Sequence, residues 1–363
     1  MKERLLSLDV FRGMTILFMI IVNTPGSWNY VYAPLRHANW EGCTPTDLVF
    51  PFFVFIVGLS MVFSISRLTG KDKPQVALKI LRRTALIFLV GLFLNWFPFF
   101  HKHISELRIM GVLQKIALSY GGAAFIILYA NKYWLPFITA LILLAYWGLF
   151  VFFGGEIPYG LETNIVRMVD LKILGADHLY GGFGVPFDPE GLLGCIPSVG
   201  TVLIGYIFGR RILEASSKQR LVQEYTIGGV ILTVVGLLWG MSFPIIKALW
   251  TSSYVLYTAG LALLFFSILI YIIDIQNLKK WTYPFRVFGL NPLFSYALSG
   301  LFVKLFIYVI KWNGTNPLGW MYANVYQPFF GDYLGSLVSA IMYTAFIWFF
   351  AWLLYRKKIV IKL

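Results

Sequence analysis

His37, one of four histidines in the sequence, has the residue types around it that proton transfer needs. It lies in a polar segment that also contains Glu41 and Asp47, and either carboxylate could orient the imidazole ring. Histidine is the side chain that most readily gains or loses a proton near neutral pH. His37 is therefore a candidate general base, although a loop histidine is more often only a polar residue.

Polar residues also interrupt the first apolar segment of the chain. Asn23 lies deep in that segment, and the Thr-Pro-Gly that follows it should end a helix. Its amide could bind a reacting group, or it could bind a neighbouring helix. Asp9 and Arg12 are three residues apart, so they share a helical face and could pair, either as a structural ion pair or within a site.

Further polar groups lie within or beside later apolar segments. Asp188 and Glu190 flank a proline, so they could cap a helix that begins there, or bind sugar hydroxyls or an ammonium group. Gln114 and Lys115 lie inside an apolar segment, where a charge needs a partner or a water-filled cavity. Asn291 places an amide before a helix-distorting proline.

The elements that position these residues belong to a chain too apolar to cover a soluble globule. Of its 363 residues, 59% are hydrophobic and 13% are charged, whereas about a quarter of the residues of a soluble domain are charged. Apolar stretches of bilayer-spanning length recur, and such stretches must be helical. They are 8–25, 46–66, 77–98, 110–130, 133–153, 191–212, 224–245, 252–273, 286–310 and 334–355. We predict an all-α bundle of about ten transmembrane helices that forms a single domain, 1–363.

Lysine and arginine alternate between the connecting segments. The basic set contains Lys2, Arg4, Arg67, Lys71, Lys73, Lys79, Arg82, Arg83, Lys132, Arg210, Arg211, Lys218, Arg220, Lys279, Lys280, Arg286, Arg356, Lys357, Lys358 and Lys362. The positive-inside rule places this set in the cytoplasm and both termini with it. The net charge of +14 is then mostly a topology signal, so we predict no nucleic-acid partner.

The other connecting segments contain few basic residues, among them Arg36, Lys102, Lys172, Lys247 and Lys311. They include the longest loops, near 26–45, 99–109, 154–190 and 311–333. Long polar loops on a rigid scaffold usually carry binding residues.

Cysteine and metal chemistry have weak support in the sequence. Cys43 and Cys195 fall near the same predicted membrane face, where two separate apolar residues are favoured over one bridge. His101 and His103 have no further clustered ligands, so we predict no metal.

Several motifs, in the same order along the chain, resemble the heparan-alpha-glucosaminide N-acetyltransferase family, a group of membrane acyltransferases with bacterial homologues. They are RLLSLDVFRG at 4–13, HANWEG at 37–42, DLVFPFFVF at 47–55, RIMGVLQK at 108–115, DPEG at 188–191 and GLN at 289–291. The resemblance implies an enzyme of the bacterial cytoplasmic membrane that uses cytosolic acetyl-CoA. It would acetylate the amine of a glucosamine-type sugar across the membrane.

The resemblance also implies roles for individual residues. His37 would be the general base or an acetyl carrier, Asn23 would stabilise the oxyanion, and Asp47 is assigned to the same catalytic group. Charged phosphates enter hydrocarbon only at high cost, so those of CoA should rest among basic residues. The residues assigned to acetyl-CoA are Arg12, Arg82, Arg83, Arg108, Gln114, Lys279, Arg286 and Asn291. Those assigned to the amino sugar or glycan acceptor are Asp9, Trp40, Asp188 and Glu190.

Two other functions stay open at this point, and so does a homodimer. One is O-acetylation of a surface glycan. The other is proton-coupled transport of a small molecule, in which His37 would belong to a proton relay.

Overall fold

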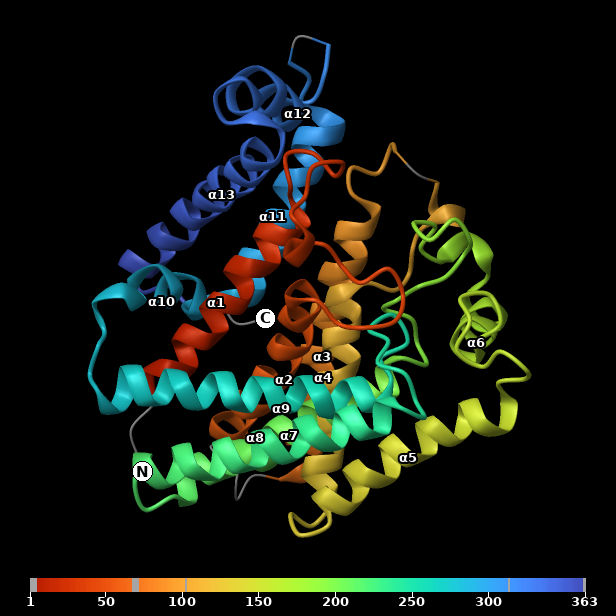
Figure 1. Ribbon diagram of the computed structural model, residues 1–363, viewed down its shortest axis with the longest axis vertical. Coiled ribbons are helices and arrows are strands. Elements are labelled where there is room, and N and C mark those ends of the chain that lie inside the picture. The colour runs from red at the N-terminus through yellow and green to blue at the C-terminus, as the bar shows by residue number, and fades with distance from the viewer. Residues whose placement is uncertain (1–4, 67–71, 102, 313, 362–363) are drawn as a thin grey trace.

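The computed structural model describes residues 5–66, 72–101, 103–312 and 314–361, which form helices joined by loops (Figure 1). In these ranges the chain makes two isolated β-bridges and no strand. The long helices are α1 (Leu6–Asn23), α2 (Pro45–Ser66), α3 (Lys73–Trp96), α4 (Val112–Tyr129), α5 (Leu135–Phe153), α7 (Cys195–Glu214), α8 (Lys218–Gly240), α9 (Ser252–Leu269), α11 (Pro292–Lys304) and α13 (Gln327–Arg356). The short helices are α6 (Ile165–Leu174), α10 (Tyr283–Leu290) and α12 (Pro317–Met321). Turns of π-helix continue α9 to Ile275, α11 to Val309 and α12 to Tyr326.

The predicted all-α membrane bundle is confirmed, because every predicted apolar segment overlaps a helix. Within the described part of the chain, 9 helices are long and apolar enough to span a bilayer. The remaining predicted segment is α3, which carries Lys79, Arg82 and Arg83 in its first half. The orientation with both termini inside and the single-domain assignment stay predictions. Some charges behind the orientation lie outside the described residues, namely Lys2, Arg4, Arg67, Lys71, Lys102 and Lys362.

Glycine residues allow α2 and α7 to pack with their backbones in close contact. A methyl group on Gly205 of α7 would lie 2.1 Å from the carbonyl oxygen of Phe55 in α2. One on Gly58 of α2 would lie 2.0 Å from the carbonyl oxygen of Val202 in α7. Small residues are the usual means of close helix packing in a bilayer, where the hydrophobic effect does not drive helices together.

Helix α1 lies between the two halves of the bundle (Figure 1). It contacts α2 and α9 on one side and α10, α11 and α13 on the other. Its first turn is held by Asp274, whose two carboxylate oxygens accept hydrogen bonds from the backbone N–H groups of Leu6 and Ser7, both at 3.2 Å. The start of α1 is therefore fixed without a capping side chain of its own.

Three of the four long loops that the sequence predicts on one face, 26–45, 99–109 and 154–190, meet at one end of the bundle, toward the right in Figure 1, whereas 311–333 lies with α12 at the top. The indole N–H of Trp40, in the loop after α1, donates to the carbonyl oxygen of Tyr159 in the loop after α5, at 2.8 Å. The backbone N–H of Ile109, after α3, donates to the carbonyl oxygen of His178, after α6, at 3.2 Å. Polar side chains from distant parts of the sequence are thereby brought together.

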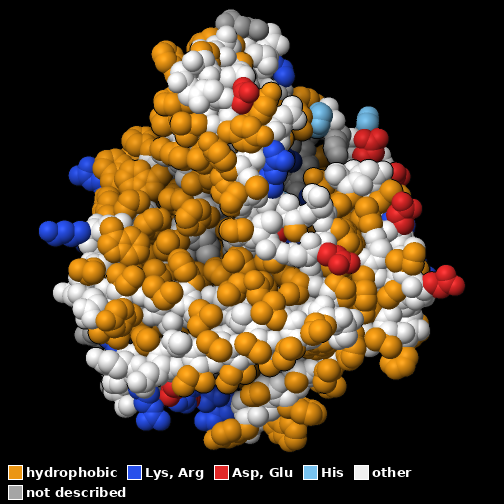
Figure 2. Space-filling model, viewed as in Figure 1, with side chains coloured by type: hydrophobic (Ala, Val, Ile, Leu, Met, Phe, Trp, Pro, Cys, Tyr) orange, Lys and Arg blue, Asp and Glu red, His pale blue; other side chains and the backbone are white. Residues whose placement is uncertain are grey.

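The molecular surface carries a broad apolar area. Figure 2 shows hydrophobic side chains across the middle of one face, with Lys and Arg near the lower and left edges and Asp and Glu mostly at the right. Large exposed apolar residues include Phe137, Leu141 and Leu144 of α5 and Val234 and Leu238 of α8. Such an area suits contact with lipid rather than water.

Filling the close contact between α2 and α7 should destabilise the bundle. We expect Gly205→Ala to lower the free energy of unfolding by about 1–3 kcal/mol, because the new methyl group meets backbone that cannot move aside. The measurement is thermal unfolding of the protein in detergent.

A matched control for this prediction is Gly148→Ala in α5. There the new methyl group would lie 3.8 Å from the ring of Phe152, an ordinary contact. Equal melting temperatures for the two variants would show that the α2–α7 contact is not tightly packed.

Candidate active site

The imidazole of His37 is bound to a buried carboxylate. His37 Nδ1 lies 2.6 Å from Asp47 Oδ1, and the two side chains are 45% and 1% exposed. A neutral ring whose proton is on Nδ1 donates it to this carboxylate, which only accepts hydrogen bonds, and keeps a lone pair on Nε2. This is the arrangement that a histidine general base requires.

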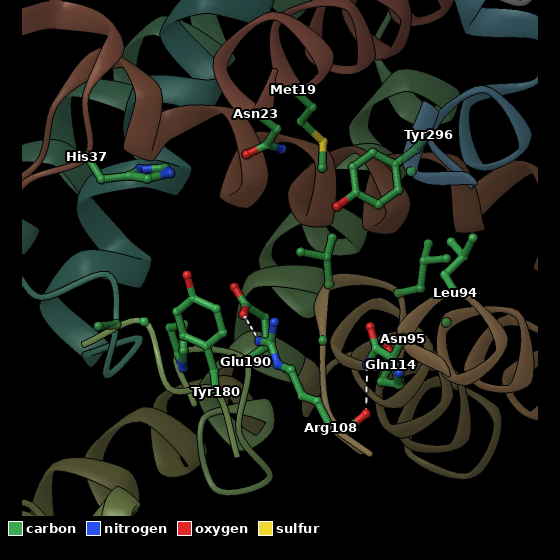
Figure 3. A pocket seen from close by; sticks show the side chains of 18 of the residues that line it. Met19, Asn23, His37, Leu94, Asn95, Arg108, Gln114, Tyr180, Glu190 and Tyr296 are labelled. Carbon is green, nitrogen blue, oxygen red and sulfur yellow. Dashed lines mark hydrogen bonds and ion pairs between the residues drawn. The ribbon is translucent and has the colours of Figure 1, made fainter. Parts of the chain in front are cut away.

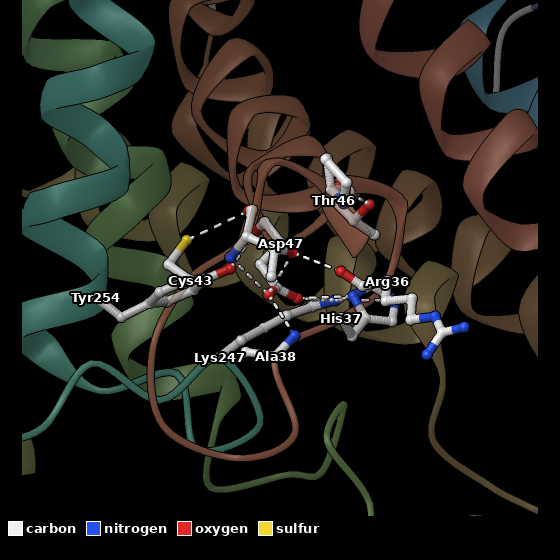
Figure 4. A network of polar contacts seen from close by, with 10 residues as sticks. Arg36, His37, Ala38, Cys43, Thr46, Asp47, Lys247 and Tyr254 are labelled. Atoms are coloured by element: carbon white, nitrogen blue, oxygen red, sulfur yellow. Dashed lines mark hydrogen bonds and ion pairs between the residues drawn. The ribbon is translucent and has the colours of Figure 1, made fainter. Parts of the chain in front are cut away.

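Asp47 lies in the first turn of α2 and organises the loop before that helix. Its Oδ2 accepts hydrogen bonds from the backbone N–H groups of Ala38 (2.9 Å) and Thr44 (3.0 Å) and from the Thr44 hydroxyl (3.0 Å). The segment from His37 to Thr44 is thus fixed at both ends to one carboxylate (Figure 4).

Lys247, in the loop between α8 and α9, adds a positive charge to this pair. Its Nζ lies 3.3 Å from Asp47 Oδ1 and 2.9 and 3.5 Å from Nδ1 and Nε2 of His37. The backbone N–H of Gly42 donates to the carbonyl oxygen of Ile245 at 2.8 Å, which joins the two loops. In the sequence, Lys247 stands out only as one of the few basic residues on this face.

His37 opens into a cavity of about 520 Å³, which we call the outer cavity. Figure 3 shows the side chains of Asn23, Tyr296, Tyr180 and Glu190 around the same space. Other polar residues that line it are Asn95, Arg108, Gln114 and Lys247. Helix α1 ends at Asn23, as the following Thr-Pro-Gly predicts, and so this amide lies at the cavity.

Arg108 forms an ion-pair cluster in the wall of the outer cavity. Its Nη2 lies 2.7 Å from Asp188 Oδ1 and 2.6 Å from Glu190 Oε2, and its Nε lies 2.8 Å from Asp188 Oδ2. The guanidinium also lies over the ring of Tyr180, 4.7 Å from the ring centre. The two carboxylates raise the pKa of Arg108 further above its ordinary value, so it stays charged at every relevant pH.

Of the two roles that the sequence leaves open for Asp188 and Glu190, capping of a helix does not apply, because α7 begins at Cys195. Asp188 instead closes a turn, with its Oδ1 accepting from the backbone N–H of Glu190 at 2.9 Å. The acids are held by their ion pairs with Arg108, and these do not require a helix.

Lys115 supports this turn from inside the bundle. Its Nζ donates to the carbonyl oxygen of Pro189 at 3.0 Å and lies 4.2 Å from the ring centre of Trp250. Lys115 Nζ, inside an apolar helix, thus has a hydrogen-bond acceptor and an aromatic ring as partners.

Asp170 of α6 also supports this turn. No motif in the sequence indicates this role for Asp170. Its Oδ1 accepts from the backbone N–H of Leu192 at 3.0 Å, while its buried Oδ2 has no hydrogen-bond partner. A methyl group on Gly191 would lie 1.7 Å from this Oδ2. Burial, with Asp188 as a lesser cause, raises the pKa of Asp170 from 3.8 to about 7.

Trp40 lies in the wall of the outer cavity and is fixed by other aromatic residues. Its ring centre is 6.0 Å from that of Phe183 and 5.4 Å from that of Phe187. Its indole N–H is already bound to the loop after α5, so the aromatic face rather than the N–H is left for a ligand.

A second cavity of about 430 Å³ lies nearer the start of α1, and we call it the basic cavity. Arg12, Arg83 and Asn291 line it, together with Ser60 and Tyr120. Arg12 Nη2 donates to Ser60 Oγ at 2.7 Å, and the Arg83 guanidinium lies 4.7 Å from the ring centre of Tyr120. None of the described residues that line this cavity is acidic.

The two cavities share the helices α1, α2, α3, α4 and α11. On α1, Arg12 lines the basic cavity and Met19 lines the outer one, about 10 Å apart along the helix axis. On α4, Tyr120 and Gln114 are related in the same way, about 9 Å apart. The cavities therefore lie in sequence along one group of helices.

The structure divides the residues that the sequence assigned to acetyl-CoA. Arg12, Arg83 and Asn291 line the basic cavity, whereas Arg108 and Gln114 line the outer cavity with His37. Three others line neither of these cavities: Arg82, Lys279 and Arg286.

The residues assigned to the acceptor are divided as well. Trp40 and Glu190 line the outer cavity, and Asp188 is buried behind Glu190. Asp9 lies 14 residues before Asn23 on α1, about 21 Å along the axis, and forms the predicted ion pair with Arg12 at 3.5 Å. Asp9 is thus at the opposite end of α1 from the outer cavity.

The two cysteines are free. Burial and the charge of Asp47 raise the pKa of the Cys43 thiol to about 12, so this thiol stays protonated. Of the other histidines, His101 lies against the ring of Tyr308, and His178 Nδ1 lies 2.7 Å from the carbonyl oxygen of Leu107.

The raised pKa of Asp170 makes folding stability dependent on pH. Between pH 4 and 7 the unfolded chain loses this proton and the folded chain keeps it, so stability falls as pH rises through this window. We expect Asp170→Asn to flatten the dependence of melting temperature on pH in that window. Asp177→Asn, an exposed aspartate nearby, is the control and should keep the wild-type slope. An unchanged slope in Asp170→Asn would mean that this carboxyl ionises normally.

Comparison with known proteins identifies the family of this chain. Residues 4–239 match the family model described as "Heparan-alpha-glucosaminide N-acetyltransferase, catalytic". The chain is 28% identical to human heparan-alpha-glucosaminide N-acetyltransferase, with 100% of this chain and 60% of the human protein covered. It is 26% identical to the mouse protein of the same name, with 99% and 61% covered. The chain thus spans about 60% of the length of these curated relatives.

The matched region contains His37, Asn23, Asp47, Arg108 and Glu190, which line or support the outer cavity. On this match, the chain belongs to the heparan-alpha-glucosaminide N-acetyltransferase family.

Proposed function

We propose that this protein is a membrane acetyltransferase that moves an acetyl group from acetyl-CoA to the amine of a glucosamine-type sugar. The observation that carries the proposal is the His37–Asp47 pair at the outer cavity. The helices that line this cavity also line the basic cavity, where Arg12 and Arg83 lie. Such an arrangement suits a reaction whose charged donor and sugar acceptor approach from opposite ends of a bundle.

The basic cavity is the proposed site for the nucleotide end of acetyl-CoA. Arg12 and Arg83 supply positive charge, and the first turn of α11, from Pro292, forms part of its lining. Unpaired N–H groups at the start of a helix favour a phosphate, and guanidinium groups bind it with charge-assisted hydrogen bonds. The phosphates would thus be neutralised without entering hydrocarbon.

The uncharged pantetheine arm would reach from the basic cavity toward His37 between the shared helices. Leu293 at one cavity and Tyr296 at the other are one turn apart on α11, so little protein separates the two spaces. The thioester would then lie in the outer cavity, near Asn23 and Gln114.

The acceptor sugar is proposed to bind at the loop side of the outer cavity. Trp40 and Tyr180 offer aromatic faces for a sugar ring, and Glu190 offers a carboxylate oxygen to hydroxyl or amine groups. The ion pair with Arg108 keeps Glu190 in position, so the sugar would meet a preorganised wall.

In the proposed reaction the sugar amine attacks the thioester carbonyl carbon, and a C–N bond forms. His37 Nε2 takes the proton from the attacking amine, and Asp47 stabilises the resulting imidazolium. The C–S bond then breaks, and the CoA thiolate receives a proton from the imidazolium. Attack by Nε2 itself, to form an acetyl-histidine, uses the same geometry and stays an alternative.

Two groups could stabilise the negative oxygen of the tetrahedral intermediate. The Asn23 amide lies at the cavity, and the ammonium of Lys247 lies 3.5 Å from His37 Nε2. A positive charge fixed beside the reacting centre acts without reorganisation during the reaction. Lys247 also places its positive charge 3.3 Å from the Asp47 carboxylate.

With both termini in the cytoplasm, the basic cavity would face cytosolic acetyl-CoA and the outer cavity would face the opposite side of the membrane.

A turnover assay of the purified protein with acetyl-CoA and a panel of amino sugars tests the function. Mild alkali then distinguishes the expected amide from an ester, which only an O-acetyltransferase would form. Sugar uptake into liposomes without CoA would favour a transporter and contradict the proposal.

Removing the imidazole should abolish turnover but not donor binding. We expect His37→Ala to lower kcat by about 10²–10⁴-fold, because general-base catalysis is lost, with CoA affinity unchanged by calorimetry. His103→Ala, an exposed histidine outside both cavities, should keep wild-type activity. Normal turnover in His37→Ala would remove this residue from the mechanism.

Removing the charge of Lys247 should also slow the chemical step. We expect Lys247→Met to lower kcat by about 10²-fold, as loss of one oxyanion donor does, and Lys247→Arg to retain part of the rate. Steady-state kinetics with both substrates varied provides the measurement. A change in KM alone would assign Lys247 to substrate binding instead.

A further inference from the structure

The segment after α13 turns back toward the bundle. Helix α13 ends at Arg356, and Lys358 adopts the left-handed conformation with φ of 53°. The backbone N–H of Ile359 then donates to the carbonyl oxygen of Leu354 at 3.0 Å, which closes the turn. Residues 359–361 continue beyond this turn without helical structure.

Asn291, at the junction of α10 and α11, holds this segment with both ends of its amide. Its Nδ2 donates to the carbonyl oxygen of Ile359, and its Oδ1 accepts from the backbone N–H of Ile361, each at 2.8 Å. The side chain is 2% exposed. Moving the segment would leave both polar ends of a buried amide without partners, so these two hydrogen bonds fix its position.

The held segment forms part of the basic cavity. Val360 and Ile361 line it together with Arg12 and Arg83. Val360 is nevertheless 51% exposed, so an apolar side chain faces open space beside two guanidinium groups. The neighbouring Lys357 and Lys358 are exposed as well.

We propose that this segment is part of the donor site, with Val360 forming an apolar surface for the purine of acetyl-CoA. Asn291 is then a positioning residue that acts through the segment rather than by touching the nucleotide. The inference rests on the proposed function, because it takes acetyl-CoA as the donor.

The chemistry of the cavity favours a nucleotide over other occupants. A purine has a flat apolar face that can cover Val360, and the phosphates attached to it need nearby cations. No acidic side chain among the described lining residues would repel those phosphates. A lipid tail would cover Val360 too, but it would bring no phosphate to the guanidinium groups of Arg12 and Arg83.

The test compares two donors, acetyl-CoA and S-acetylpantetheine, which lacks the nucleotide. We expect Val360→Asp to raise the KM for acetyl-CoA and the Kd for CoA by about tenfold, because the apolar contact is lost and a carboxylate is added. The KM for S-acetylpantetheine should not change. Val360→Leu, which keeps an apolar surface, should lose much less affinity for CoA than Val360→Asp.

Ile359→Asp is the matched control, because it makes the same change one residue earlier, on a side chain outside the cavity lining. An equal loss in both variants would assign the effect to the segment as a whole and overturn the role of Val360. Unchanged CoA binding in Val360→Asp would also overturn it, and the proposed function would stand. A wild-type protein that neither binds nor uses acetyl-CoA would overturn the proposed function, and this inference with it.

Discussion

The buried carboxylate of Asp47 is the group on which the outer site depends. It binds the ring of His37, the backbone of the loop at Ala38 and Thr44, and the ammonium of Lys247. A carboxylate that is 1% exposed would be costly to bury without such partners. The same contacts that satisfy its charge therefore fix the histidine, the loop before α2 and the loop before α9 in one arrangement.

In the wall of the outer cavity opposite His37, charged side chains are likewise held by their partners. There Arg108 satisfies Asp188 and Glu190, and Lys115 satisfies the carbonyl group of the turn between them. Most charges in this region have a partner, and Asp170 responds to its burial with a raised pKa. Charged groups within a membrane protein thus form a rigid frame, and loops that connect distant helices can line a defined cavity.

Much of the fold could be predicted from the sequence, because hydropathy and segment length determine where a chain crosses a bilayer. The end of α1 at Asn23 followed from local residue types, and the His37–Asp47 contact spans only 10 positions. Lys247 lies 210 positions from His37, and no local pattern connects the two. The clamp of Asn291 on Ile361 likewise joins residues 70 positions apart.

Distant contacts also explain why no helix begins beside Asp188. Aspartate, proline and glutamate in that order are typical of the first turn of a helix, but the ion pairs with Arg108, 80 and 82 positions away, favour a turn. The resemblance assigns Asp9 to the acceptor, whereas α1 places it about 21 Å along the helix axis from Asn23, at the other end of the helix from the outer cavity.

The state of Cys43 has a consequence for acyl chemistry nearby. A thiolate close to a thioester would exchange with it and carry the acyl group away as a protein-bound product. The pKa of the Cys43 thiol is raised to about 12, so its sulfur is a poor nucleophile at neutral pH. The Sγ–H group donates to the carbonyl oxygen of Thr44 at 3.7 Å. Burial of the thiol, with the carboxylate that orients the imidazole as a lesser cause, thus also protects the site from self-acylation.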